Sequence, residues 1–217
     1  MSVESYIEKR KDYEYYKVLR SLLRLICRSE DTICDVGSGG IDLLSELPCK
    51  KKFSIDLRNP VSNEEVEGIK ADYLSYESSA VDIITCFQVL EHLKDGAVEE
   101  FAKKLLREGR IVIVSVPYMW PENQCEDHVQ DPMDVEKLIS WFGKNPAFLH
   151  VVTEKSKLAR IIAIFIQDYN PDIDLEYWRE NADNALKLRL DRLLQLNGKR
   201  SFFNRIRRLC LSIIKKR

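Results

Sequence analysis

A cluster of glycines follows closely on an acidic residue in the stretch ICDVGSGGIDLL, residues 33–44. Asp35 stands two residues before Gly37, and Gly39 begins a pair of adjacent glycines. Glycines at the end of a strand let the backbone approach a ligand closely, because they lack a Cβ. The dinucleotide pattern Gly-x-Gly-x-x-Gly fails here, since Asp42 occupies its last position. The stretch therefore predicts a nucleotide-binding turn of a different kind.

Two further acidic residues end the apolar runs that follow. Asp56 lies in FSIDL, 21 residues after Asp35, and Asp72 lies in KADYL. An acid about 20 residues beyond the first is placed to accept hydrogen bonds from ribose hydroxyls. A carboxylate or backbone amide at Asp72 could meet an adenine edge. The carboxylate of Asp35 suits a cationic or amino-bearing ligand better than a bare pyrophosphate.

Short apolar runs predict the strands that must position these acids. The runs are continuous, as is typical of parallel strands buried on both faces, and helical patterns lie between them. The alternation predicts a doubly wound α/β domain. The predicted strands are Thr32–Val36, Phe53–Ile55, Ile69–Ala71, Val81–Phe87 and Arg110–Val116, and the predicted helices are Tyr6–Cys27 and Gly96–Arg107.

The sheet is expected to end in an antiparallel pair. Phe148–Thr153 and Arg160–Gln167 read as strands, and the gap EKSKLA between them is too short for a helical crossover. A helix from Asp134 to Phe142, capped by Asp134, precedes them. We expect a Rossmann-like seven-stranded sheet, mostly parallel with its last strand antiparallel, and helices on both faces.

The composition changes after Asp168. Helical patterns run from Asp183 to Leu196 and from Phe202 to Ile214. Residues 199–217 carry eight Lys and Arg and no acid, whereas the other 198 residues hold 26 basic and 35 acidic side chains. A basic amphipathic helix fits an anionic membrane surface, or it packs on the body of the protein. Nucleic acid is not expected as a partner, because no aromatic side chain is interleaved with these basic residues.

The compartment is expected to be the cytoplasm. The six cysteines form no Cys-x-x-Cys pair, so we expect free thiols in a reducing environment. The charged, aromatic N-terminus contains no apolar signal segment. No apolar run approaches the length of about 18 residues that a membrane span needs.

The order of these motifs resembles that of class I S-adenosylmethionine-dependent methyltransferases, and it is similar to the type called methyltransferase type 11. The matching pieces are ICDVGSGGIDLL, FSIDL, IKADYL, VDIITCFQVLEHL and LREGRIVIVSVP, over about residues 1–167. The resemblance implies a methyltransferase domain at residues 1–168, followed by a helical extension at 169–217. It implies S-adenosylmethionine as cofactor and S-adenosylhomocysteine as product. Ile41 stands where the family has its third glycine.

The resemblance also implies roles for individual residues. The methionine part of the cofactor would be surrounded by the glycine turn, with Asp35, Gly37 and Gly39. The ribose would be held by Asp56, and Leu57 would lie against the adenine, which Asp72 and Tyr73 would flank. The residues that leave the fourth strand, Phe87 and Gln88, would lie near the methionine part and the sulfonium.

Histidines are the candidates for a general base. His128 lies in the polar loop ENQCEDHVQDP, which should overhang the site after the fifth strand, and it is the preferred base. His92, in LEHL, is the second candidate, with a structural hydrogen bond as its alternative role. His150 is expected to be structural. A metal site from His128 and the acids around it, Glu126, Asp127 and Asp131, has no recognisable ligand spacing, so no metal is predicted.

The acceptor is expected to be a small or lipid-linked molecule methylated on a hydroxyl, with a sugar of a cell-surface glycan as first choice. Quinone or lipid methylation is the runner-up. Two other classes stay open: a catalytically silent module that binds S-adenosylmethionine, and a nicotinamide-dependent oxidoreductase. The intact acids and glycines disfavour the first, and the missing dinucleotide pattern disfavours the second. The protein would be cytoplasmic, with possible peripheral attachment to the inner face of the membrane.

Overall fold

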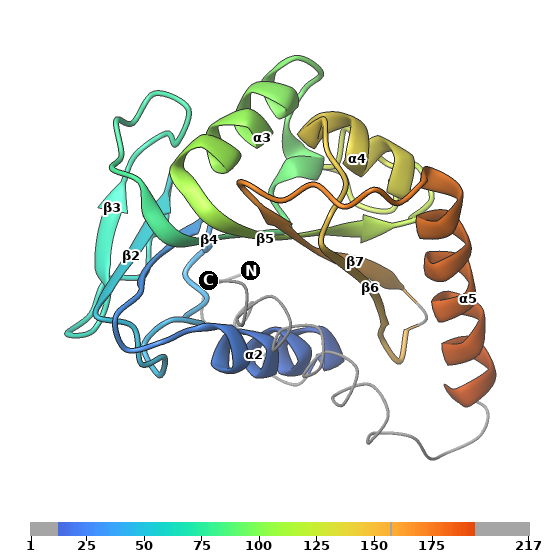
Figure 1. Ribbon diagram of the computed structural model, residues 1–217, viewed down its shortest axis with the longest axis horizontal. Helices are drawn as coiled ribbons and strands as arrows, with labels where there is room; N and C mark the ends of the chain where they lie inside the picture. Colours follow the sequence, from blue (N-terminus) through green and yellow to red (C-terminus); the bar gives the residue numbers. More distant parts are fainter. Residues whose placement is uncertain (1–12, 157, 194–217) are drawn as a thin grey trace.

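The chain folds around one seven-stranded sheet. The computed structural model describes residues 13–156 and 158–193, with side chains as far as Asn184. The strand order is β3-β2-β1-β4-β5-β7-β6 (Figure 1). The strands are β1 Thr32–Val36, β2 Lys51–Asp56, β3 Glu67–Lys70, β4 Val81–Phe87, β5 Gly109–Tyr118, β6 Phe148–Thr153 and β7 Ala159–Ile166.

The direction of the strands agrees with the sequence analysis. The neighbouring strands from β3 to β5 pair in parallel, and β7 pairs antiparallel with both β5 and β6. The predicted terminal hairpin is therefore confirmed. The strand β5 is almost wholly buried and the middle of β4 is buried, as their continuous apolar runs indicated.

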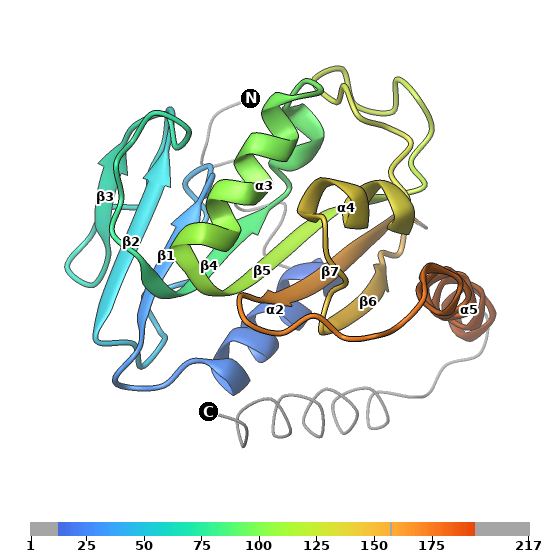
Figure 2. The ribbon, with the colours of Figure 1, turned by 45° about the horizontal axis from the view of Figure 1, so that its top comes forward.

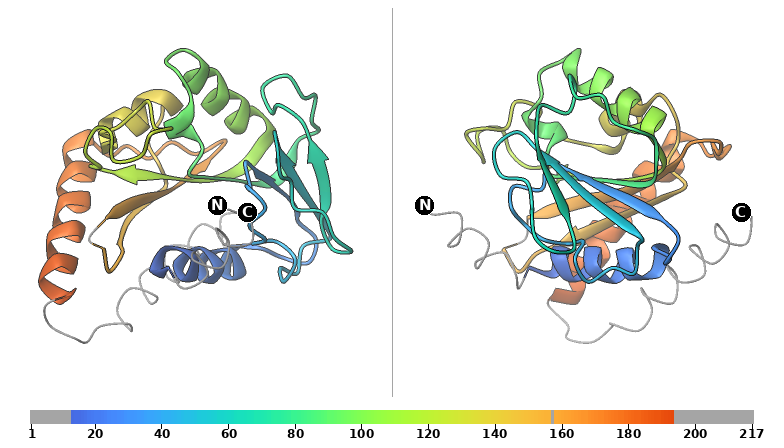
Figure 3. Two further views of the ribbon diagram at one scale, coloured as in Figure 1. Left: turned by 180° about the vertical axis from the view of Figure 1, so that it is seen from behind. Right: turned by 90° about the vertical axis from the view of Figure 1, so that its left-hand side faces the viewer.

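Helices lie on both faces of the sheet, as predicted. Figures 1 and 3 show α3 and α4 over one face and α2 under the other. In α4 the Asp134 side chain accepts a hydrogen bond from the Lys137 amide at 2.8 Å, which confirms the predicted N-cap. The helices are α2 Glu14–Ile26, η1 (a short 3-10 helix) Leu90–His92, α3 Ala97–Glu108, α4 Val135–Phe142 and α5 Leu175–Leu193.

The last helix begins earlier than its leucine pattern suggested. The prediction of a start at Asp183 is wrong, because α5 already begins at Leu175. The Asp174 carboxylate accepts a hydrogen bond from the Tyr177 amide at 2.8 Å, so it caps the first turn. Trp178 and Ala182 are buried in the core, and Figure 2 shows α5 beside β6.

The predicted C-terminal amphipathic helix, Phe202–Ile214, lies outside the described residues, as does the first part of the predicted N-terminal helix. Within the described part of the chain, none of the helices is long and apolar enough to cross a membrane. The described cysteines are free thiols, as expected.

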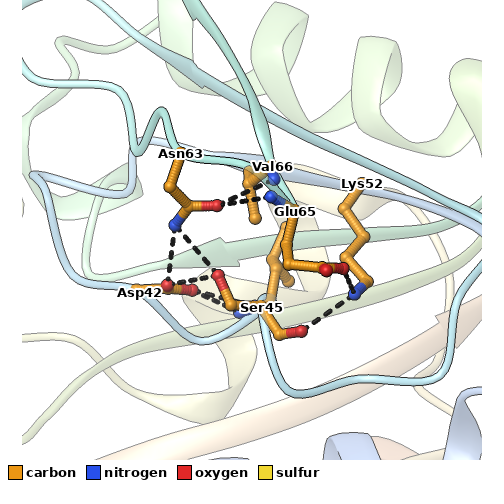
Figure 4. Close-up of polar contacts among 7 residues, drawn as sticks. Asp42, Ser45, Lys52, Asn63, Glu65 and Val66 are labelled. Atoms are coloured by element: carbon orange, nitrogen blue, oxygen red, sulfur yellow. Dashed lines mark hydrogen bonds and ion pairs between the residues drawn. The ribbon is translucent and has the colours of Figure 1, made fainter.

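Loops, not helices, connect the first three strands. Residues 37–50 join β1 to β2, and residues 57–66 join β2 to β3. Figure 4 shows how the two loops are held together: the Asn63 amide donates to Asp42 at 3.2 Å and to Ser45 at 3.0 Å. From β2, Lys52 reaches the Ser45 carbonyl at 2.8 Å and Glu65 at 3.0 Å. These polar contacts join two connections that lack helices.

The Asp42 carboxylate is the centre of this network. It accepts hydrogen bonds from the amides of Leu44 and Ser45, at 3.0 and 2.9 Å, and from the Ser45 hydroxyl at 2.5 Å. Partial burial works against its ionisation, but the hydrogen bonds outweigh burial and hold the pKa of Asp42 below its usual value.

We predict that Asn63→Ala lowers the free energy of unfolding by about 1–2 kcal/mol, since it removes the donors to Asp42 and Ser45 and the acceptor for the amides of Glu65 and Val66. Urea unfolding measures the change. Glu64→Ala, at an exposed neighbouring position, is the matched control. Equal stability of the two variants would show that the network does not hold the loops.

Candidate functional site

The predicted site lies where the chain reverses its direction of winding. From β1 the chain proceeds to β2 and β3 on one side, and β4 and β5 lie on the other. In open α/β sheets, ligands bind at this switch point, beyond the carboxyl ends of the strands. The residues that follow β1, β2 and β4 are the glycine turn, Leu57 and Gln88.

The glycine turn is shaped by two different constraints. A Cβ on Gly37 would lie 2.3 Å from Cγ2 of Val89, and its φ of +78° already favours glycine. Gly39 also has a positive φ, of +56°, but a Cβ there would meet no heavy atom within 4 Å. Gly37 is therefore required by packing against the protein, whereas Gly39 faces open space and could approach a ligand.

Asp56 fastens this turn to the end of β2. One oxygen of its carboxylate accepts a hydrogen bond from the Gly39 amide at 2.8 Å. The other accepts from the amides of Arg58 at 2.7 Å and Asn59 at 2.8 Å. A carboxylate has about four acceptor positions, so these bonds leave capacity at the oxygen next to Gly39. Leu57, the next residue, is 62% exposed.

Asp35 is a buried acid at the end of β1. Its side chain is 3% exposed, and it accepts a hydrogen bond from the Thr85 hydroxyl at 2.6 Å. Burial raises the pKa of Asp35 to about 7; the bond from Thr85 opposes the rise, and the charges of Asp56 and Asp42 add to it. The charge of Asp35 is therefore sensitive to any cation bound nearby.

The two residues predicted to flank the adenine, Asp72 and Tyr73, differ in their exposure to solvent. Asp72 is exposed, and its carboxylate accepts from the Leu74 amide at 3.1 Å. Tyr73 is 4% exposed: its ring packs against Phe101 of α3, and its hydroxyl donates to Glu108 at 2.9 Å. The expectation that Tyr73 flanks an adenine is therefore corrected for its side chain, which belongs to the core.

Gln88 leaves β4 with a positive φ of 57°. Its amide nitrogen donates to the Ser115 hydroxyl at 3.3 Å, and its amide oxygen accepts from Arg160 Nε at 2.9 Å. These bonds fix the side chain against β5 and β7. Phe87 before it is half-buried and packs on the hydrophobic cluster that includes α2.

Arg160 is a residue of this region that the sequence analysis missed. It is 6% exposed, and its guanidinium carbon lies 5.1 Å from the ring centroids of both Tyr15 and Trp120. It also pairs with Glu154 at 3.6 Å, and Glu154 accepts hydrogen bonds from the first amides of α2, including that of Tyr15 at 3.0 Å. Arg160 thus connects Gln88 to the start of α2. Its position in an apolar strand was the available signal.

The two candidate bases, His92 and His128, lie side by side. Their ring centroids are 4.9 Å apart, and Trp120 stacks on His128 at 5.5 Å. His92 Nδ1 is 2.9 Å from the Asp127 carbonyl, and His128 Nδ1 is 2.7 Å from the Asp131 carboxylate. Burial lowers the pKa of His92, although the bond to the Asp127 carbonyl opposes that change. His150, in contrast, lies on β6 near Phe148.

The long loop after β5 is held firmly against η1. The Val129 amide donates to the Glu91 carbonyl at 2.9 Å. The Gln130 side chain donates to the Leu93 carbonyl and to Asp95, both at 2.8 Å. The loop therefore has a defined position against η1, the segment that follows β4.

Of the acids near His128 in the sequence, Asp131 contacts its ring at Nδ1, but none belongs to the group of possible metal ligands around it. The sequence analysis predicted no metal from Glu126, Asp127, His128 and Asp131. In the described part of the chain, the residues whose possible ligand atoms converge are Glu91, His92 and His128, all within 4.8 Å of one another. Glu91 was missed because the loop and η1 are far apart in the sequence.

Comparison with solved structures shows that the fold is that of S-adenosylmethionine-dependent methyltransferases. One similar chain belongs to the complex between the Haloferax volcanii methyltransferase activator Trm112 and a methyltransferase, with 11% identity, 78% of this chain and 96% of that chain covered, and a TM-score of 0.61. Another is the Burkholderia thailandensis 1,6-didemethyltoxoflavin-N1-methyltransferase with bound 1,6-didemethyltoxoflavin and S-adenosylhomocysteine, with 13% identity, 75% and 83% covered, and a TM-score of 0.56.

The chain is also similar to the small RNA methyltransferase HEN1, with 20% identity over 72% of this chain and a TM-score of 0.55. It spans 25% of the length of that HEN1 chain. No protein-family model matches the sequence, and no curated protein matches it. The structural likeness therefore confirms the predicted fold.

We predict that Asp35 makes stability fall as pH rises. Its native pKa of about 7 lies above the ordinary value of about 3.9, so the native state binds more protons between these values. This contribution to stability is complete below about pH 4 and is lost as pH approaches 7. Asp35→Asn retains an oxygen that can accept from Thr85 but cannot titrate.

Urea unfolding of both proteins between pH 4.5 and 8 measures this contribution. The wild type should lose stability relative to Asp35→Asn as pH rises. Parallel pH profiles for the two proteins would contradict a raised pKa at Asp35.

Proposed function

We propose that this chain, which has the fold of class I S-adenosylmethionine-dependent methyltransferases, is such an enzyme and methylates a hydroxyl of a small-molecule acceptor. The observation that carries the proposal is the glycine turn at the switch point. Gly39 faces open space there, and Asp56 holds its amide at 2.8 Å. A nucleoside ligand binds in this position in related sheet folds.

The residues around the turn fit the cofactor. Asp56 retains acceptor capacity for a ribose hydroxyl, and the exposed Leu57 offers an apolar surface to a base. Asp35 would favour the positively charged methionine part, since a nearby cation stabilises an ionised carboxylate. Asp72 lies beyond β3 for the adenine edge, where Tyr73 can contribute only its backbone. The backbone at Phe87 and Gln88 would lie near the methionine part of the cofactor and its sulfonium.

When bound, S-adenosylmethionine would supply an electrophilic methyl group for transfer to the acceptor oxygen, with its sulfur as leaving group. The hydroxyl proton would pass to a base, for which His128 is the first candidate and His92 the second. The protein then has mainly to align the acceptor. His92 and His128 are proposed to contact the acceptor hydroxyl. Their Nδ1 atoms are engaged by Asp127 and Asp131, which leaves Nε2 of each ring for the acceptor.

A sugar of a cell-surface glycan is the acceptor that we propose first. Its support is the basic amphipathic sequence at residues 199–217, which suits an anionic membrane surface where such glycans are assembled. A quinone or lipid acceptor would use the same surface. A cytoplasmic enzyme attached to the inner face of the membrane is consistent with either.

We predict that Asp56→Ala weakens binding of S-adenosylhomocysteine by at least about tenfold, because a charge-assisted bond to the ribose contributes about 1.5–3 kcal/mol. Isothermal titration calorimetry measures the affinity. Asp56 also holds Gly39, so an analogue without the ribose 2′- and 3′-hydroxyls is the control. It should bind the variant and the wild type about equally. A comparable loss for both ligands would assign Asp56 to the loop and not to the ribose.

We predict that His128→Gln reduces methyl transfer by about 10²-fold or more while affinity for S-adenosylhomocysteine stays within about twofold, since the histidine acts on the acceptor side. Transfer from labelled S-adenosylmethionine is measured against a panel of glycan, quinone, lipid and small RNA acceptors. His150→Gln, on β6, is the matched control and should retain activity. A protein that binds the cofactor but methylates none of the panel would favour the catalytically silent module.

A further inference from the structure

We propose that Glu91, His92 and His128 form a binding site for one divalent transition-metal cation. Each residue offers a possible ligand atom, and the three atoms lie within 4.8 Å of one another. Glu91 and His92 come from η1, and His128 comes from the loop after β5. Two imidazoles and one carboxylate form a ligand set that proteins use for Zn²⁺ and for non-haem Fe²⁺.

Hydrogen bonds at the far side of both rings prepare the histidines as ligands. The Asp127 carbonyl lies 2.9 Å from His92 Nδ1 and can only accept, so that nitrogen carries the proton. The Asp131 carboxylate lies 2.7 Å from His128 Nδ1, and the Asp131 side chain is 2% exposed. Metal-bound histidines typically donate their other N–H to a carboxylate or a backbone carbonyl. Both rings therefore keep a lone pair on Nε2.

The two segments that carry the ligands are fixed to each other. The Val129 amide, one residue after His128, donates to the carbonyl of Glu91 at 2.9 Å. Gln130 is 2% exposed and bonds to the Leu93 carbonyl, just after His92. The site is thus held from both sides without the metal, as a preformed set of ligands requires.

The ligand chemistry favours zinc or a neighbouring first-row cation over magnesium. Imidazole nitrogen suits Zn²⁺ and Fe²⁺, whereas Mg²⁺ is bound mainly through oxygen and retains several waters. The Glu91 carboxylate is fully buried, and a divalent cation beside it would offset part of the cost of burying its charge. His92 is exposed, so a cation can reach the group from solvent.

The role of the cation rests on the proposed function. Three protein ligands leave a further coordination position open, where an acceptor hydroxyl could bind. The cation would orient that oxygen and make loss of its proton to solvent water easier, so that the histidines, bound to the cation through Nε2, would not themselves take the proton. Cation binding itself requires neither cofactor nor acceptor, so it can be tested separately from methyl transfer.

The test is calorimetric titration of Zn²⁺ into the full chain after treatment with a chelator and its removal, without cofactor or acceptor. We expect one cation bound per chain and at least about tenfold weaker binding of Mg²⁺. His92→Ala, at an exposed position, should weaken Zn²⁺ binding by at least about tenfold. Asp131→Ala should weaken it by about 10–100-fold through the orientation of His128. His150→Gln, elsewhere on the sheet, should leave it unchanged.

Substitution with Co²⁺ supplies a spectroscopic readout of the same ligands, and Cys125→Ser tests the thiol on the same loop. Binding that survives both His92→Ala and His128→Ala, or that depends on Cys125, would overturn the proposal. Methyl transfer that persists in excess chelator, in a protein that binds no cation, would overturn the cation site alone. Cation binding without any methyl transfer would instead count against the proposed function alone.

Discussion

The structure depends on one carboxylate that joins two loops at the end of the sheet. Asp56 accepts amides from its own loop, at Arg58 and Asn59, and from Gly39 in the turn after β1. No helix follows either β1 or β2 in the described chain, so neither connection can hold itself by helical hydrogen bonds. The positions of the glycine turn and of the predicted ribose acid are therefore determined together.

The other half of the site is organised around a long loop. The loop carries His128, which lies beside His92 of η1. Hydrogen bonds from Val129 and Gln130 fix the loop to η1 and so hold the two histidines together. Trp120 contacts both His128 and Arg160, and Arg160 links Gln88 to Trp120 and to Glu154. The proposed cofactor and acceptor regions therefore share supports, and a change in the loop would be expected to affect both.

The sequence predicted the strands well because continuous apolar runs have few alternatives in a chain of this length. It also predicted the cap of α4, since an aspartate before an apolar helical pattern satisfies free amides. It placed the start of α5 too late, because Asp174 and Trp178 lie before the leucine repeat that carried the prediction. The side chain of Tyr73 lies in the core, which the sequence did not reveal because an aromatic residue after a strand can face either a ligand or the core.

The sequence by itself determined which side chains lie at the ends of successive strands: an acid and glycines at the first and a second acid at the next. It also determined the terminal hairpin. Local patterns suffice for these features, because each depends on neighbouring residues. Only the tertiary structure decided that Glu91 joins the two histidines as a possible metal ligand, and that Arg160 lies against Gln88. Those contacts join residues 36 to 72 positions apart, and their formation depends on how the loops pack over the sheet.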